Sequence, residues 1–223
     1  MKKTVLFDFV NTLAYLSPTR EEILQQFLQE KKELILEAYR DTDEQSYYSS
    51  VNITDSTQKR VFYQEYNQKL FTNLGLVCYN EFHDYYNNVK KEWLLYEDSL
   101  STIETLKAKD INVGIISNFD KNLDEVLRFL KIDNLLDILV ISADIQIEKP
   151  SIEFYKYVKN NYNLDLDKTL YVGDSYNLDY KPSRAVGFKS FIIDRNNLYS
   201  GMPNLIQKLS DIIEKTSYAP QSL

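Results

Sequence analysis

The sequence is poor in residues that bind soft metals or cross-link a chain. Cys78 is the only cysteine and His83 the only histidine among 223 residues. A single cysteine excludes an intrachain disulfide, and the two residues together argue against a zinc or other transition-metal centre. Oxygen-liganded cations such as Mg²⁺ remain compatible with the composition, because carboxylates supply their ligands.

Basic residues and long apolar runs are also scarce. Lys and Arg number 26 against 33 Asp and Glu, which gives a net charge of −7, whereas a nucleic-acid-binding protein needs a basic face. No stretch approaches the ~20 apolar residues that span a bilayer. The apolar start, residues 4–7, meets Asp8 before it reaches the length of a secretion signal. We therefore expect a soluble, cytoplasmic protein that binds neither nucleic acid nor membrane.

Glycine and proline number only five each, whereas 43% of the residues are hydrophobic. Such a chain is neither low-complexity nor disordered, and it has the apolar material for a core. Its length exceeds the roughly 100 to 150 residues of an average domain but falls short of two. We expect one core domain with a sizeable insertion.

Apolar periodicity divides the chain into two textures. Residues 3–9 form an apolar run typical of a strand that is buried on both faces of a parallel sheet. Over residues 19–93, apolar residues recur three and four apart, which predicts helices. The positions are Ile23, Phe27, Leu34 and Ala38, then Val61, Phe62, Tyr66 and Leu70, then Phe82, Tyr86 and Val89. We expect Thr19 to cap the first helix, residues 41–52 to form a loop, and residues 73–75 to end the second helix.

From Ser99 onward, predicted helices and strands alternate. The helices are 99–109, 123–130, 152–160, about 178–186, and 204–214, and the strands are 113–117, 138–142, 170–173 and 190–193. This alternation implies right-handed βαβ crossovers and a parallel sheet with helices on both faces. The predicted fold class is α/β, with a Rossmann-like core at residues 1–16 and 95–223 and an inserted helical cap domain at 17–94.

Polar residues follow four of these strands, where packing alone requires none. Asp8 and Thr12 follow the first strand, Ser117 and Asn118 the second, Lys149 the third, and Asp174 and Asp179 the fourth. The carboxyl ends of parallel strands meet at one edge of the sheet, where ligands bind. Three carboxylates, a lysine and hydroxyl or amide donors are the groups required for Mg²⁺-assisted phosphoryl chemistry. A lone aspartate at a strand end is more often a helix cap, so the prediction depends on the whole set.

These segments resemble the four motifs of the haloacid dehalogenase-like (HAD) hydrolase superfamily, with a helical cap between the first and second motifs. They read FDFVNTL at residues 7–13, IISNFD at 115–120, EKP at 148–150, and VGDS at 172–175 with Asp179 behind it. The resemblance covers the whole chain, because residues 19–93 have the length and helical texture of that cap.

The resemblance implies a role for each residue of the set. Asp8 is the nucleophile that becomes a phosphoaspartate, and Lys149 and Ser117 assist it. The phosphate is held by Thr12, Ser117, Asn118 and Lys149, and Mg²⁺ by Asp8, Asp174, Asp179 and the backbone carbonyl of Val10. Asp179 either closes the outer shell of the metal or orients Lys149. The implied partner is a small phosphorylated metabolite whose identity is set by the cap, and the protein is expected to be a monomer or a homodimer.

Val10 departs from the pattern, because most phosphatases of the superfamily carry there a second aspartate that protonates the leaving group. Loss of a general acid costs about 10² to 10⁴ in rate. Three outcomes stay open: a substrate whose leaving group needs no proton, such as an acyl phosphate or an anhydride; an acid borrowed from the cap; or a binding or regulatory protein without catalysis.

A fourth outcome is a 2-haloacid dehalogenase-type hydrolase, because members that release halide also lack the second aspartate. Those members tend to lose the acidic fourth motif, which Asp174 and Asp179 keep here. The phosphatase is therefore the favoured interpretation. A second, milder departure is Asn11, which replaces the usual glycine; asparagine tolerates left-handed backbone geometry, so we expect the loop to form.

Overall fold

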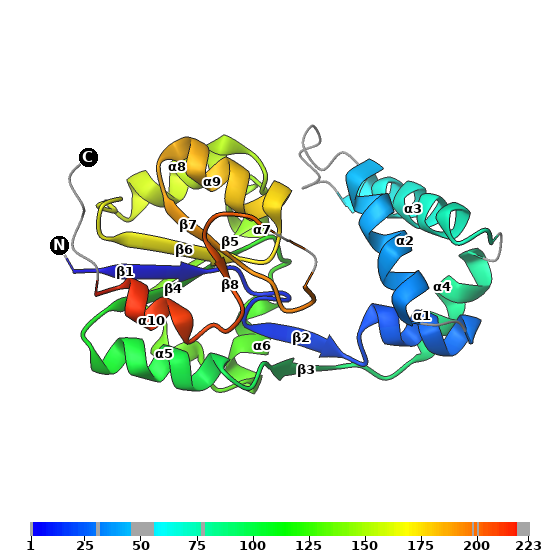
Figure 1. Cartoon of the computed structure of the whole chain (residues 1–223), viewed down its shortest axis with the longest axis horizontal. Coiled ribbons are helices and arrows are strands. Elements are labelled where there is room, and N and C mark those ends of the chain that lie inside the picture. The colour runs from blue at the N-terminus through cyan, green and yellow to red at the C-terminus, as the bar shows by residue number, and fades with distance from the viewer. Residues whose placement is uncertain are drawn as a thin grey trace. The chain divides into compact units, whose positions relative to one another are not determined.

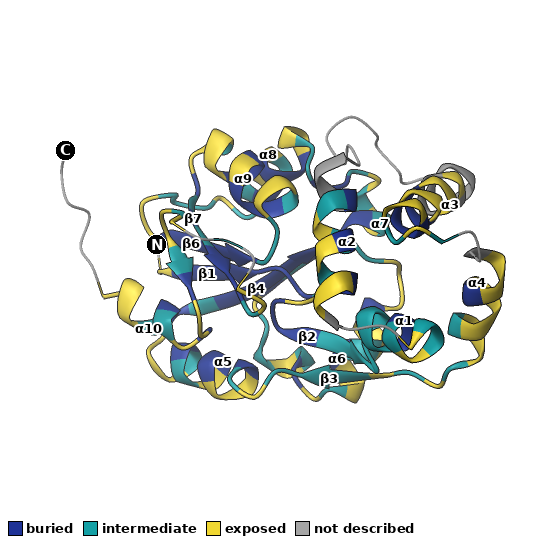
Figure 2. Ribbon diagram, turned by 45° about the vertical axis from the view of Figure 1, so that its right-hand side comes forward, coloured by how far each residue is buried: buried dark blue, intermediate teal, exposed yellow. Residues whose placement is uncertain are grey.

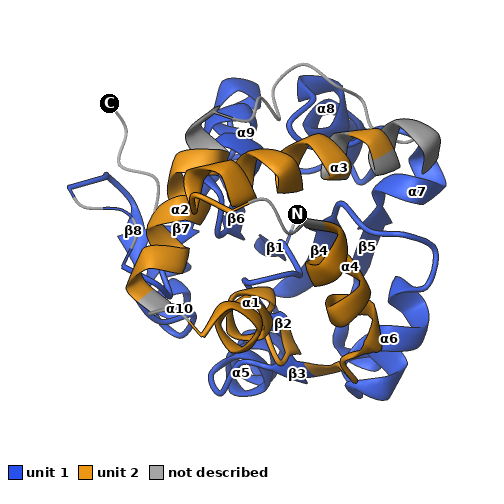
Figure 3. Ribbon diagram, turned by 90° about the vertical axis from the view of Figure 1, so that its right-hand side faces the viewer, with its two compact units in different colours: residues 1–15, 94–223 blue, residues 16–93 orange. Residues whose placement is uncertain are grey.

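A computed structural model describes residues 2–29, 32–45, 56–76, 79–197, 199 and 201–217 (Figure 1). The chain forms two compact units (Figure 3): a core unit, Met1–Tyr15 with Leu94–Leu223, and a helical unit, Leu16–Trp93. It passes from one unit to the other within strands β2 (Ala14–Ser17) and β3 (Glu92–Leu95), which pair as a two-stranded sheet. Among the described residues, no helix combines the length and the apolar character that crossing a membrane requires.

Six parallel strands form the sheet of the core unit, in the order β5-β4-β1-β6-β7-β8. They are β1 (Thr4–Phe7), β4 (Asn112–Ser117), β5 (Ile138–Ile141), β6 (Thr169–Gly173), β7 (Lys189–Ile193) and β8 (Leu205–Ile206). Strand β1 is buried along its whole length, as its apolar run predicts. Its last residue, Phe7, pairs with Ile115 of β4 and Val172 of β6. The predicted α/β, Rossmann-like fold class is confirmed.

Helices cover both faces of this sheet (Figure 1). Helices α8 (Ile152–Asn161) and α9 (Lys181–Val186) lie on one face, and α5 (Ser99–Ala108), α6 (Leu123–Phe129) and α10 (Asp211–Lys215) lie on the other. Three short segments complete the unit: η1 (Asp133–Leu135), α7 (Ser142–Ile145) and the π-helical η2 (Tyr176–Tyr180). Figure 2 shows the strands buried and the outer faces of the helices exposed. Phe154, Tyr155 and Tyr171 pack together in the core on the α8 side of the sheet.

The helical unit contains α1 (Arg20–Leu28), α2 (Lys32–Gln45), α3 (Ser56–Asn73) and α4 (Tyr79–Asn88). Thr19 caps α1, as predicted: its side chain accepts a hydrogen bond from the backbone of Glu22, whose carboxylate accepts one from the backbone N–H of Thr19 (2.8 Å). Helix α3 ends at Asn73 as predicted, and Gly75 follows with a positive φ of 72°.

The first predicted helix is two helices, which corrects the sequence interpretation. Gln29 adopts left-handed geometry (φ 56°) and ends α1. Because α2 begins anew at Lys32, its inward face is out of phase with α1: Ile35 is fully buried, whereas Leu34 is 50% exposed. The assignment of Leu34 to the apolar face was therefore wrong. Val61, placed on the apolar face of α3, is 44% exposed.

Two further boundaries differ from the prediction. Helix α2 continues to Gln45, into the segment expected to be a loop, and residues 46–52 of that segment lie outside the described residues. Residues 204–214 are not one helix: Leu205–Ile206 pair with β7 as strand β8, and Asp194 N donates to Ile206 O (3.0 Å). The paired strand satisfies backbone groups at the sheet edge that a helix would leave without partners. Strands β2 and β3 were not predicted.

The neighbours Leu34 and Ile35 provide a stability test of the helix break. Ile35→Ala should lower the free energy of unfolding by about 2 to 5 kcal/mol, because it opens a cavity in a buried cluster. Leu34→Ala should change it by no more than about 0.5 kcal/mol, because the side chain is half exposed. Urea denaturation followed by circular dichroism measures both variants. Equal losses would contradict the register of α2.

Candidate active site

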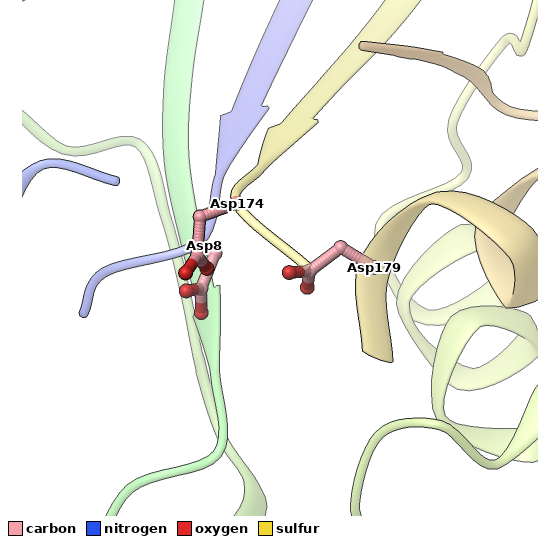
Figure 4. Close-up of side chains that lie close together, drawn as sticks. All are labelled: Asp8, Asp174 and Asp179. Atoms are coloured by element: carbon pink, nitrogen blue, oxygen red, sulfur yellow. The ribbon is translucent and has the colours of Figure 1, made fainter. Parts of the chain in front are cut away.

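The predicted polar residues meet at the carboxyl edge of the sheet. Asp8 directly follows β1, Asp174 directly follows the neighbouring strand β6, and Asp179 lies in η2. Figure 4 shows Asp8 and Asp174 side by side at the two strand ends, with the carboxylate of Asp179 pointing toward them. The three residues each offer a carboxylate oxygen within 4.8 Å of the others. The strand order brings these residues together, because β1 and β6 are adjacent and parallel.

Lys149 lies in the middle of this cluster and is buried. Its Nζ donates hydrogen bonds to Asp8 Oδ1 (2.6 Å), Asp179 Oδ1 (2.7 Å) and the Tyr171 hydroxyl (3.3 Å). Burial alone would lower the pKa of Lys149, but the carboxylates of Asp179 and Asp8 raise this pKa above its ordinary value. The ammonium therefore stays charged at any physiological pH.

Ser117 and Asn118 connect strand β4 to the same cluster. The Ser117 hydroxyl donates to Asp8 Oδ1 (3.1 Å). The Asn118 side-chain amide donates to the carbonyl of Lys149 (2.8 Å), and its oxygen accepts from the Lys149 backbone N–H (2.8 Å). The side chain of Asn118, expected to bind phosphate, thus holds the backbone that carries the lysine.

The loop of residues 9–13 follows Asp8 and turns tightly on itself. Leu13 N donates to Phe9 O (2.9 Å), and Asn11 N donates to Ala14 O (2.7 Å). Asn11 has a φ of 59°, so it adopts the left-handed geometry expected of it. Thr12 is fully buried, and its Oγ1 has no hydrogen-bond partner within the described part of the chain. Buried hydroxyls are normally satisfied, so this oxygen is an exception among the described residues.

Asp179 is held by the protein through both of its oxygens. Oδ1 accepts from Lys149 and from the Tyr171 hydroxyl (2.5 Å), and Oδ2 accepts from Ser175 N (3.0 Å). Gly173 permits this close approach, because a Cβ at that position would lie 2.4 Å from Asp179 Cγ. Of the two roles considered for Asp179, the hydrogen bonds favour orientation of Lys149.

Tyr171 belongs to this network, although it was not among the site residues predicted from the sequence. Its hydroxyl contacts both Lys149 and Asp179 from within strand β6. Burial raises the pKa of Tyr171 well above 10, and Asp179 raises it further, so the hydroxyl remains a neutral donor. In the sequence it is one residue of an apolar strand run, and no motif distinguishes it.

The site has more negative than positive charge. Asp8, Asp174 and Asp179 contribute three carboxylates against the single ammonium of Lys149. Burial raises the pKa of Asp174 well above its usual range, and Asp179 and Asp8 raise it further. Burial also raises the pKa of Asp8, an effect that Lys149 opposes. A divalent cation with oxygen ligands would relieve this repulsion, and the all-oxygen donor set fits Mg²⁺.

The raised pKa of Asp174 predicts a pH-dependent stability in the presence of a chelator. A carboxyl that binds its proton more tightly in the folded protein stabilises the fold at low pH, and that stability is lost as pH rises from the ordinary value of 3.8 through the raised value. The stability of Asp174→Asn relative to wild type should therefore increase as pH rises over this interval. Urea denaturation at a series of pH values measures the difference.

Mg²⁺ should reverse the relative stabilities of wild type and Asp174→Asn. The ion should raise the midpoint of thermal unfolding of wild type, because a ligand that binds only the folded state stabilises it. It should raise that of Asp174→Asn much less. Asp144→Asn, which changes an exposed aspartate of α7, is the matched control and should behave as wild type. If Mg²⁺ raised the unfolding midpoint equally in all three proteins, Asp174 would not be a ligand of the ion.

Comparison with known proteins identifies the family. The haloacid dehalogenase-like hydrolase family matches residues 5–193. The haloacid dehalogenase-like hydrolase domain-containing protein 3 of Danio rerio is 27% identical over 107 residues, which are 48% of this chain and 44% of that protein. The glyceraldehyde 3-phosphate phosphatase of Methanocaldococcus jannaschii is 28% identical over 162 residues, 67% of each chain. The chain thus spans less than half the length of the first of these relatives.

The fold is also found among solved structures. An L-2-haloacid dehalogenase superposes with a TM-score of 0.69 and 14% identity, over 97% of this chain and 99% of that one. At this identity the likeness establishes the fold alone. The family match, in contrast, extends from strand β1 to the end of β7 and includes every residue of the cluster at the sheet edge. The protein therefore belongs to the haloacid dehalogenase-like hydrolase family.

Proposed function

We propose that this protein is a Mg²⁺-dependent phosphatase that acts on a small phosphorylated metabolite through a phosphoaspartate at Asp8. The observation that carries the proposal is the buried Lys149, bonded to Asp8 and Asp179 beside a third carboxylate, Asp174. Family membership supports a hydrolase, and one relative is named a phosphatase of glyceraldehyde 3-phosphate. Those findings leave the substrate of this chain open.

In the proposed reaction, a carboxylate oxygen of Asp8 attacks phosphorus, and the bond from phosphorus to the leaving oxygen breaks with its electron pair. Lys149 and Ser117 donate to Asp8 Oδ1 and fix the rotation of that carboxylate. Water then attacks the phosphorus of the phosphoaspartate, which frees Asp8 and releases phosphate. Lys149, Ser117 and the unpartnered Thr12 hydroxyl supply donors for the phosphoryl oxygens. Asn118 acts by holding the backbone of Lys149.

Asp8, Asp174 and the backbone carbonyl of Val10 would hold the metal ion. When bound, Mg²⁺ supplies charge neutralisation at the phosphoryl oxygens. Asp179 would not be a direct ligand of the ion; its carboxylate orients Lys149. We also infer that residues 17–94 act as the cap that selects the substrate, because the inserted segment Leu16–Trp93 forms a compact helical unit of its own.

Val10 limits which substrates can react. It is a half-buried alkyl side chain in the loop that follows Asp8, so it can neither protonate a leaving group nor activate water. Substrates whose leaving group departs without a proton, such as acyl phosphates, anhydrides or aryl phosphates, should therefore react faster than alkyl esters.

The second candidate is a 2-haloacid dehalogenase-type hydrolase, and Val10 is again the observation that favours it. Halide leaves without a proton, so a missing acid costs such an enzyme nothing. The charge balance argues against this candidate, because displacement of halide by Asp8 does not explain three carboxylates beside one lysine. A protein that binds a phosphorylated ligand without turnover is the remaining alternative.

Phosphate release from a panel of substrates tests the proposal. Wild type should release phosphate from acyl and aryl phosphates with Mg²⁺ and not with a chelator, and more slowly from sugar phosphates. Asp8→Asn should reduce all turnover to background, because the carboxamide is no nucleophile. Asp144→Asn, at the exposed position on α7, should retain full activity.

Metal-dependent turnover that survives in Asp8→Asn would overturn the phosphoaspartate. Chloride release from 2-chloro acids without any phosphate release would establish the second candidate instead. If neither phosphate nor chloride is released but the protein still binds phosphate, the alternative of a binding protein without turnover would be supported.

Val10→Asp tests whether the missing acid limits the rate. If the protein is a phosphatase, this change should raise the hydrolysis of alkyl phosphates by about 10² to 10⁴, because it restores a proton donor at the leaving oxygen. Val10→Asn is the matched control, since its side chain has the same shape without the acid, and it should give no gain. A gain in neither variant, with wild type active on aryl phosphates, would show that the missing acid at position 10 does not limit the hydrolysis of alkyl phosphates.

A further inference from the structure

Arg195 contacts the loop of residues 9–13, although it belongs to none of the four motifs. It follows strand β7 and is largely buried, with a side chain 14% exposed. Its Nε and Nη2 both donate to the carbonyl of Thr12, at 3.3 and 2.8 Å. The guanidinium thus binds the backbone of Thr12, whose hydroxyl has no hydrogen-bond partner among the described residues.

Other contacts fix the guanidinium itself. Nη2 also donates to Asp98 Oδ1 (3.0 Å), and Asp98 Oδ2 accepts from the backbone of Leu209 (2.7 Å). The ring of Tyr96 lies beneath the guanidinium, with its centroid 3.7 Å from Cζ. A planar fork that bonds two acceptors and stacks on a ring is specific to arginine, because an ammonium offers neither the fork nor the flat face.

The next carbonyl in the loop is held from the same side. Leu13 O accepts from Tyr96 N (3.0 Å) and from the Ser99 hydroxyl (2.7 Å). Two successive carbonyls of the loop are therefore anchored by Arg195 and by residues 96–99. Those residues come directly after the chain returns from the helical unit at Leu94.

We propose that Arg195 is a positioning residue that holds the loop of residues 9–13, and with it Asp8, in the geometry required for phosphoryl transfer. It acts through the Thr12 carbonyl and does not touch the reacting atoms. The kinetic part of this inference rests on the proposed function, whereas the loop-holding part does not. Misplacement of a reacting group by about 1 Å can cost 10²-fold in rate.

The experiment compares Arg195→Met with Arg184→Met in the full-length chain. Arg184 is an exposed arginine of α9 that also lies near a tyrosine ring, with its Cζ 5.8 Å from the Tyr180 centroid, and it serves as the matched control. Amide hydrogen exchange is followed by mass spectrometry on a peptide that covers residues 9–14 and on one that covers β6. Turnover of an aryl phosphate is measured on the same samples at a temperature where all proteins are folded.

Arg195→Met should exchange at least about tenfold faster at residues 9–14 and unchanged at β6, because only the local anchor is lost. Its kcat should fall by about 10²-fold with KM changed much less, because the geometry of attack is disturbed while ligand contacts remain. Guanidinium ion added to Arg195→Met should recover part of the kcat, and Arg184→Met should match wild type in every measurement.

Unchanged exchange at residues 9–14 would overturn the inference, and so would equal acceleration in β6, which would indicate a general loss of stability. If Arg195→Met does not fold, Arg195→Lys replaces it: an ammonium has neither the planar fork that bonds Thr12 O through two nitrogens nor the flat face that stacks on Tyr96, so the loop should exchange faster and kcat should fall by about tenfold. Wild-type exchange and kcat in Arg195→Lys would also overturn it. If wild type shows no Asp8-dependent phosphate release, the proposed function fails, and the exchange data alone still decide the role of Arg195.

Discussion

The buried ammonium of Lys149 is the group on which the sheet edge depends. An ammonium without partners in a protein interior costs several kcal/mol, and removal of one member of a buried ion pair costs about 3 to 5 kcal/mol. Asp8, Asp179 and the Tyr171 hydroxyl together satisfy this lysine. Asp8 in turn accepts a hydrogen bond from the Ser117 hydroxyl, and Asp179 accepts one from the backbone N–H of Ser175. The ends of β1, β4 and β6 are therefore connected to the same charge, and a substitution at one of them should disturb the others.

The convergence of these residues could be predicted from the sequence, because parallel sheets impose it. Once β1, β4 and β6 are identified as buried strands, their carboxyl ends must lie together, and Asp8, Ser117 and Asp174 follow. The apolar runs that predict the strands, and Gly173 before Asp174, are signals that lie within a few residues of the feature they predict. The same holds for Thr19, which predicts the start of α1. The buried strand β1, the Thr19 cap and the end of α3, which depend on neighbours in the sequence, were predicted correctly.

Two residues outside the motifs, Tyr171 and Arg195, depend on distant partners and could not be predicted. Tyr171 has the sequence context of a core residue, and only the position of Lys149 across the fold makes its hydroxyl part of the site. Arg195 has the context of a surface loop, and its partners Thr12 and Asp98 are far away in the chain. The buried face of α2 was predicted wrongly for a related reason. Gln29 adopts left-handed geometry and ends α1, although nothing in its sequence context signals this. The chain then starts a new helix in which Ile35, not Leu34, points inward.

The charge balance of the site constrains its chemistry more than Val10 does. Three carboxylates stand beside one ammonium, and the pKa of Asp174 is raised first by burial and then by the charges of Asp179 and Asp8. A site that used no cation would gain stability from a neutral residue in place of Asp174, because repulsion and burial both disfavour its charge. Val10 removes a proton donor without changing this balance. Under the proposed function, such a site would bind a cation that balances its carboxylates and would release only leaving groups that depart without a proton.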